Sequence, residues 1–190
     1  MQFELLPGLP ATGPVPEQFS ALGRGTFRKG LVVRFVPEGH SPWVGNFQPG
    51  IGRFTGVVEH PNRSDLVVVS GGQAFVVKPQ SRDTEVLASG AIRSVIEIDS
   101  PRLLVFDHHG IRFEAFDAAG LRWRTRQVSW DGFQNVSRLG NALVGEAWNA
   151  LSESWQPFSV SLDTGATIGE SFTTFEPDRW EQLHVSSPAS

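Results

Sequence analysis

Turn-forming residues recur about every ten residues from Gly30 onward, and this spacing constrains the fold more than any other feature of the sequence. Short segments rich in Val, Ile, Phe and Trp lie between the turns, as is typical of β-strands. Strand-helix-strand units need helical stretches of about 10–15 residues between their strands, and turns this frequent leave no room for them. The sequence therefore predicts an all-β fold that runs as an antiparallel meander.

Thirteen segments of the chain have the composition and length of strands. They are residues 31–36, 54–59, 66–70, 73–78, 85–88, 92–98, 102–107, 111–117, 121–128, 133–138, 142–148, 157–162 and 166–172. We expect more than ten antiparallel strands, with under about a tenth of the residues in α-helix.

Proline and glycine divide the chain into three predicted regions. Residues 1–30 form a Pro/Gly-rich extended lead-in, because proline fixes φ and removes a hydrogen-bond donor. We expect no regular element in its first half and one short helical turn at residues 17–22. Residues 31–175 form the all-β domain, and residues 176–190 form a C-terminal tail.

A weak internal repeat runs through the predicted strands. The segments 73–87, 112–123 and 158–168 each read as an apolar strand, a polar turn and a second strand. Four-stranded propeller blades repeat about every 40–50 residues, which fits the spacing of these turns. Residues 115–123, with the sequence Ala-Phe-Asp-Ala-Ala-Gly-Leu-Arg-Trp, resemble the strand-turn-strand signature of quinoprotein-type β-propeller blades, and 162–165 is a second match. The resemblance implies blade-like hairpins and carries no cofactor site with it.

The length of the β region limits how such blades can assemble. Roughly 160 residues of β-structure make about three to four blades, at the lower end of the 4–8 that close a ring. The sequence fits an open propeller-like array, or one long meander sheet that can curl into a barrel. An open array leaves edge strands and a face uncovered, which favours association with another copy or another protein.

Charge and cysteine content exclude several classes of function. Sixteen basic and twenty acidic residues give a net charge of -4, which argues against bulk nucleic-acid binding. The chain has no cysteine, so it has neither disulfides nor thiolate metal sites. Its longest aliphatic runs are far shorter than the ~20 residues that span a bilayer. With no recognisable signal peptide at the N-terminus, a cytoplasmic location is expected.

Three arginines form the first candidate binding site. On a strand over 121–128, Arg122, Arg124 and Arg126 share one face, and Trp123 lies on the other. Such a ladder can bind anions or an acidic protein. It can equally be a solvated face neutralised across the hairpin, with Glu114 opposite Arg124. Both interpretations remain open.

Tryptophans supply the second group of candidates. Flat aromatic rings beside amides and carboxylates are typical of carbohydrate- or peptide-binding surfaces, although tryptophan also fills cores between sheets. Trp123 is expected in the core, and Trp155 is expected to be exposed in a loop over 149–156. Trp123, Trp130, Trp148 and Trp155 should cluster in one region of the sheet. The candidate binding residues are Trp43, in a long irregular loop at 40–50, together with Trp130, Asp131, Trp148 and Trp155.

Neither a catalytic motif nor a metal motif emerges from the sequence. His108 and His109 sit in one turn and the other histidines lie in separate loops, so no structural metal and no cofactor are predicted. We therefore expect a non-enzymatic domain that binds a protein partner, by analogy with bacterial accessory or immunity-type proteins. The alternative is a carbohydrate-binding or glycan-processing protein that uses the Trp-rich region 123–158.

Overall fold

The computed structural model describes residues 2–23, 29–88 and 90–169, and within them the protein is all-β with four sheets of four strands each. We call the sheets blades 1 to 4, formed by β1–β4, β5–β8, β9–β12 and β13–β16. The strands are β1 Gln2–Leu6, β2 Glu17–Phe19, β3 Leu31–Val36, β4 Trp43–Phe47, β5 Gly56–Glu59, β6 Leu66–Ser70, β7 Gln73–Lys78, β8 Asp83–Ala88, β9 Ile92–Ile98, β10 Leu103–His108, β11 Arg112–Asp117, β12 Gly120–Arg124, β13 Phe133–Leu139, β14 Ala142–Asn149, β15 Ser154–Ser161 and β16 Thr167–Ile168.

Tight hairpins generate the meander in blades 2 to 4. The β6–β7 turn has a two-residue loop, with Ser70 paired to Gln73 and positive φ angles at Gly71 (49°) and Gly72 (81°). Two successive positive φ angles match the right-handed twist of a two-residue hairpin, and glycine adopts them without strain. The predicted all-β antiparallel meander is confirmed, and so is its division into blade-like units.

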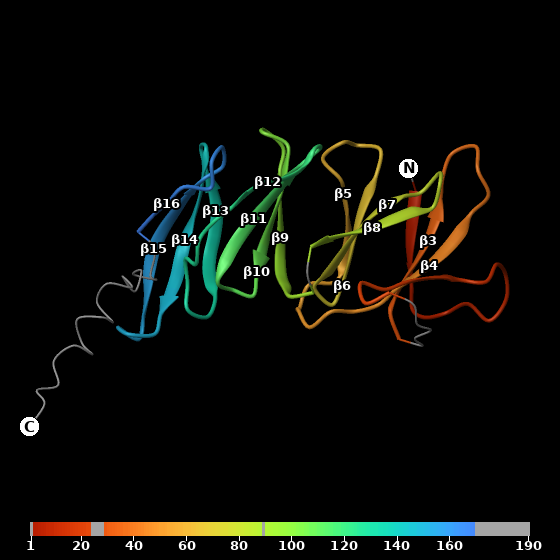
Figure 1. Ribbon diagram of the computed structural model, residues 1–190, viewed down its shortest axis with the longest axis horizontal. Helices are drawn as coiled ribbons and strands as arrows, with labels where there is room; N and C mark the ends of the chain where they lie inside the picture. Colours follow the sequence, from red (N-terminus) through yellow and green to blue (C-terminus); the bar gives the residue numbers. More distant parts are fainter. Residues whose placement is uncertain (1, 24–28, 89, 170–190) are drawn as a thin grey trace, which may run out of the picture.

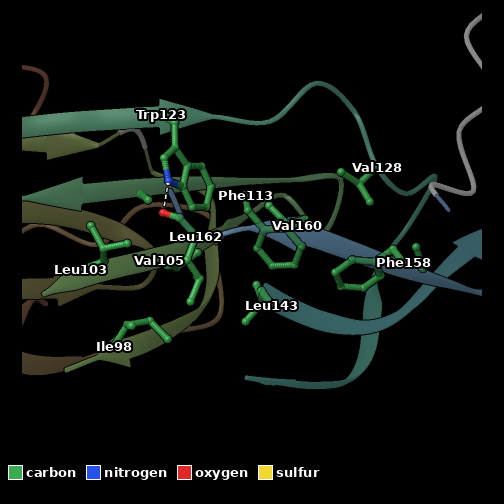
Figure 2. Packing of buried hydrophobic residues seen from close by; sticks show 12 residues of the cluster. Ile98, Leu103, Val105, Phe113, Trp123, Val128, Leu143, Phe158, Val160 and Leu162 are labelled. Carbon is green, nitrogen blue, oxygen red and sulfur yellow. Dashed lines mark hydrogen bonds between the residues drawn. The ribbon is translucent and has the colours of Figure 1, made fainter. Parts of the chain in front are cut away.

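The blades lie in a row in chain order, with blade 1 at one end and blade 4 at the other (Figure 1). Each junction between neighbours encloses one apolar cluster: Val33 and Phe75 belong to the first, Val69 and Phe106 to the second. Val105 and Leu143 belong to the third cluster, between blades 3 and 4 (Figure 2). Among the described residues no cluster joins blade 4 to blade 1, so the array is open and forms no closed barrel.

Blade 1 differs from the sequence-based prediction. Its strand order is β1-β3-β4-β2, so two strands come from the lead-in, where no strand was expected. The predicted helical turn at 17–22 is wrong, because Glu17–Phe19 pairs in parallel with β4. The loop predicted at 40–50 is also wrong, because Trp43–Phe47 pairs with β3 along its whole length. The division of the chain at residues 30 and 175 stays a prediction, and the predicted tail 176–190 lies outside the described residues.

The segment 7–16 crosses the outer face of blade 1, the face turned away from blade 2. It joins β1 and β2, which lie at opposite edges of the sheet. Val32 and Val44 lie on that outer face and are only 3% and 4% exposed. A cavity of about 400 Å³ between segment and sheet is lined by Pro10, Pro14 and Val44, among others. The chain therefore covers the part of the outer face of its own first blade that carries Val32 and Val44.

Candidate functional site

Two of the tryptophans are buried and connect neighbouring blades through a hydrogen bond. The Trp43 indole, 2% exposed, donates a 2.9 Å hydrogen bond from Nε1 to the Pro79 carbonyl in the β7–β8 turn of blade 2. Trp123 does the same at 2.7 Å to the Leu162 carbonyl of blade 4 (Figure 2). The predicted core position of Trp123 is confirmed. Trp43 is a core residue as well, so it does not belong to an exposed binding surface.

The arginine ladder is largely neutralised by carboxylates in its own sheet. Glu114 lies opposite Arg124, as predicted, although Asp117 pairs with Gly120 and a bulge at Arg122 of β12 shifts the register between the two pairs. The Glu114 carboxylate, 4% exposed, contacts Arg124 Nε at 2.7 Å and Arg112 Nε at 3.2 Å. Arg122 lies 3.7 Å from Asp117, and Arg126 is exposed beyond the end of β12. A buried carboxylate between two guanidinium groups favours the interpretation of a solvated face neutralised across the hairpin.

Trp130 and Asp131 lie in the linker that leads from blade 3 into blade 4. The Gly132 N–H donates to the Gly110 carbonyl, and the Trp130 N–H donates 3.0 Å to the Trp148 carbonyl. Asp131 forms a 2.9 Å ion pair with Arg93 of β9, in the preceding blade. The linker is thus bound to both blades, while the Asp131 side chain remains 73% exposed.

Asp107, near the end of β10, has a raised pKa. Burial raises the pKa of its carboxyl from 3.8 to about 6, although the Gly110 N–H hydrogen bond and the charge of Arg93 both lower it. Its Oδ1 accepts the Gly110 N–H at 2.8 Å and so closes the turn that contains His108 and His109.

An Asp107→Asn substitution should change how stability depends on pH. Because folding raises this pKa, the contribution of the Asp107 carboxyl to the free energy of unfolding is fully present below about pH 4. That contribution is lost as pH rises through about 6. Asparagine keeps the acceptor for Gly110 and has no such loss. Relative to the wild type, the variant should gain roughly 2 kcal/mol between pH 4 and pH 7.5, measured by urea unfolding. A difference that stays constant over this range would contradict the assignment.

Trp148 and Trp155 form an aromatic pair on the outer face of blade 4. They are directly paired across β14 and β15, with ring centroids 5.3 Å apart and planes at 63°. Both side chains are half-buried. Trp155 lies in β15 rather than in the predicted loop, because that strand begins at Ser154. The face opposite the pair carries Leu143 and Ala147, which are buried against blade 3.

The four tryptophans expected to cluster fall into two groups. Trp130, Trp148 and Trp155 lie near the β14–β15 turn, whereas Trp123 contacts Leu162, just past the other end of β15. Six residues of strand separate these ends, a distance of about 20 Å. The prediction of a single cluster is therefore wrong for Trp123.

Sequence reasoning missed Arg93, which shapes this end of the molecule. Arg93 pairs with Asp131 across 38 positions of sequence, and no local pattern marks so distant a pairing. Glu146, one of the carboxylates that the sequence places among the tryptophans of region 123–158, lies on the same face as Trp148.

Neither a metal-binding group nor a membrane-spanning helix is found among the residues that the structure describes. No three His, Asp or Glu side chains gather closely enough to hold a metal ion. In the same ranges no helix is long and apolar enough to cross a bilayer.

The fold and this face define a class of protein, an open propeller-like array of four blades. No family model matches the chain, and no curated protein matches it. Among solved structures, the β-propeller domain of Cps50 (Swd1) from Myceliophteria thermophila matches 74% of this chain with 15% identity and a TM-score of 0.46. The chain spans about half, 52%, of that structure. A likeness this distant carries no argument about partners, and the resemblance to quinoprotein-type blades stays a prediction.

Proposed function

We propose that this chain is a non-enzymatic interaction domain that binds a protein partner through the outer face of blade 4. The observation that carries the proposal is the position of this face in the array. Blades 2 and 3 use the corresponding face to pack the next blade, and in blade 4 no described residue outside the blade packs against it in a core cluster.

The strand register, counted from each hairpin turn, shows which residues of blades 2, 3 and 4 occupy equivalent positions. Counting inward from each turn, the second cross-strand pair is Val69 with Ala74 in blade 2, Asp107 with Phe113 in blade 3, and Trp148 with Trp155 in blade 4. The first two pairs are buried at a junction, and the tryptophan pair is half-buried. Large half-buried aromatic side chains are typical anchors of protein interfaces.

The other candidate surfaces receive less support. The arginine ladder, with Arg122, Arg124 and Arg126, is neutralised in part by Glu114 and Asp117. A carbohydrate site would favour coplanar tryptophan rings along a groove, whereas the planes of Trp148 and Trp155 are inclined at 63°. We therefore place Trp130, Asp131, Trp148 and Trp155 in the proposed interface. We propose that the protein acts in the cytoplasm of a bacterium.

Photo-cross-linking in producing cells tests the proposal. A benzophenone amino acid at Ile168, which is 75% exposed and belongs to the outer face, should give an adduct of one discrete mass. The same group at Ile51, 85% exposed in the linker between blades 1 and 2, is the matched control and should give none. A Trp155→Ala substitution should abolish the adduct from position 168. Equal adducts from both positions, or none, would contradict the proposal.

A further inference from the structure

Glu146 places a carboxylate on the outer face of blade 4 at a position that is apolar in blades 2 and 3. Counting inward from the turn, the fourth cross-strand pair is Val67 with Val76 in blade 2 and Val105 with Ala115 in blade 3. These four residues are all buried in apolar clusters. The equivalent pair in blade 4 is Glu146 with Pro157. A carboxylate thus replaces a buried valine in the middle of the face.

Two amide side chains fix this carboxylate without neutralising it. Glu146 Oε2 accepts hydrogen bonds from Gln134 Nε2 at 3.0 Å and from Asn135 Nδ2 at 2.7 Å. Among the described residues, none of the ion pairs within 4.0 Å includes Glu146. Burial of an uncompensated carboxylate is costly, so a partner that covers this face must bring a compensating charge.

The aromatic pair lies directly beside the carboxylate. Glu146 and Trp148 are two residues apart on β14 and therefore share one face, and Trp155 lies opposite Trp148. An indole face attracts a guanidinium or ammonium group, and a carboxylate forms charge-assisted hydrogen bonds with the same cation. Indoles and carboxylate together match a single basic side chain better than they match an apolar one.

We propose that the partner is a different polypeptide that inserts an arginine or lysine side chain between the Trp148–Trp155 pair and Glu146. This inference rests on the proposed function, because it assumes that a protein covers blade 4. A second copy fits less well when blade 4 packs on blade 4. The described residues of that face, which include Val144, Pro157 and Ser159, contain no basic side chain. Packing on blade 1 is opposed by segment 7–16, which lies over the part of that face that carries Val32 and Val44.

Titration of the purified chain with a minimal arginine probe tests the inference. The probe is N-acetyl-arginine N-methylamide, and its neutral isostere, the citrulline derivative, is the matched control. The indole N–H resonances are followed by NMR, with buried Trp43 as an internal reference. We expect saturable shifts at Trp148 and Trp155 with arginine, binding of citrulline weaker by about tenfold or more, and the same weakening in Glu146→Gln.

Three outcomes of this titration overturn the inference. They are no shift with arginine, equal shifts with citrulline, and arginine-induced shifts of Trp148 and Trp155 that keep their full size in Glu146→Gln. If one of these outcomes occurs while position 168 still gives a specific cross-link, the inference fails and the proposed function stands. A cross-link of twice the chain mass shows that the occupant is a second copy and also overturns the inference.

Discussion

A Trp43→Ala substitution should destabilise the protein by about 3–5 kcal/mol and can abolish folding altogether. Trp43 is 2% exposed, stacks on Phe35 with ring centroids 4.3 Å apart, and donates to the Pro79 carbonyl of the next blade. Its removal leaves a large cavity in the blade 1–blade 2 junction and an unpaired buried carbonyl. Urea unfolding followed by circular dichroism measures the loss.

Trp155→Ala is the matched control for this prediction. Trp155 is half-buried on the outer face of blade 4, so its loss should change stability by within about 1 kcal/mol while removing partner binding. If the two variants lost similar stability, Trp155 would belong to a core and the proposed interface would be misplaced.

A Gly52→Ala substitution should cost about 3 kcal/mol, because two backbone segments occupy the space that a side chain needs. A Cβ atom on Gly52 would collide with the Ile92 carbonyl and lie 2.8 Å from the Gly72 Cα. Both neighbours are backbone, so neither can rotate away. The Gly52 N–H also donates to the Gly71 and Gly90 carbonyls, which fixes the linker at the junction of blades 2 and 3.

Gly8→Ala supplies the control for the glycine prediction. Nothing lies within 4 Å of the Cβ position at Gly8, so this variant should unfold at nearly the wild-type urea concentration. A Gly52→Ala protein as stable as Gly8→Ala would show that the blades do not approach each other as closely as described.

The strands of blades 2 to 4 could be predicted because local chemistry and tertiary environment agree there. Apolar runs such as Leu66–Ser70, which the Gly71–Gly72 turn follows, have β-propensity and lie between two sheets that bury both of their faces. Strand pairing across the predicted hairpin also placed Glu114 opposite Arg124. The structure confirms this pair, even though a bulge separates it from the turn.

In blade 1 only β3 was predicted, at residues 31–36; β1, β2 and β4 were not, because their sequences lack a local strand pattern. The β4 strand contains Gly45 and Asn46 and is flanked by prolines, so its sequence resembles a loop. It becomes a strand because β3 pairs with it on one side and Glu17–Phe19 pairs with it in parallel on the other. Parallel pairing of a three-residue segment 28 positions away leaves no trace in composition.

The candidate site was predicted in its residue types more than in its geometry. Strand alternation did not reveal that Trp43 faces the core, because the sequence predicts an irregular loop at residues 40–50. Trp148 and Trp155 are a candidate interface because blade 4 lies at the end of the row. The sequence could not show this position, since the strand pattern is the same whether or not the array closes.

The central claim is that the two ends of the array differ: segment 7–16 lies over part of the outer face of blade 1, and among the described residues no element outside blade 4 packs a core cluster on its outer face. The most direct measurement compares photo-cross-linking in cells from Ile168, on the outer face of blade 4, with that from Val36, on the outer face of blade 1. The account predicts a discrete adduct from position 168, lost in Trp155→Ala, and none from position 36. An adduct from position 36 alone would contradict it.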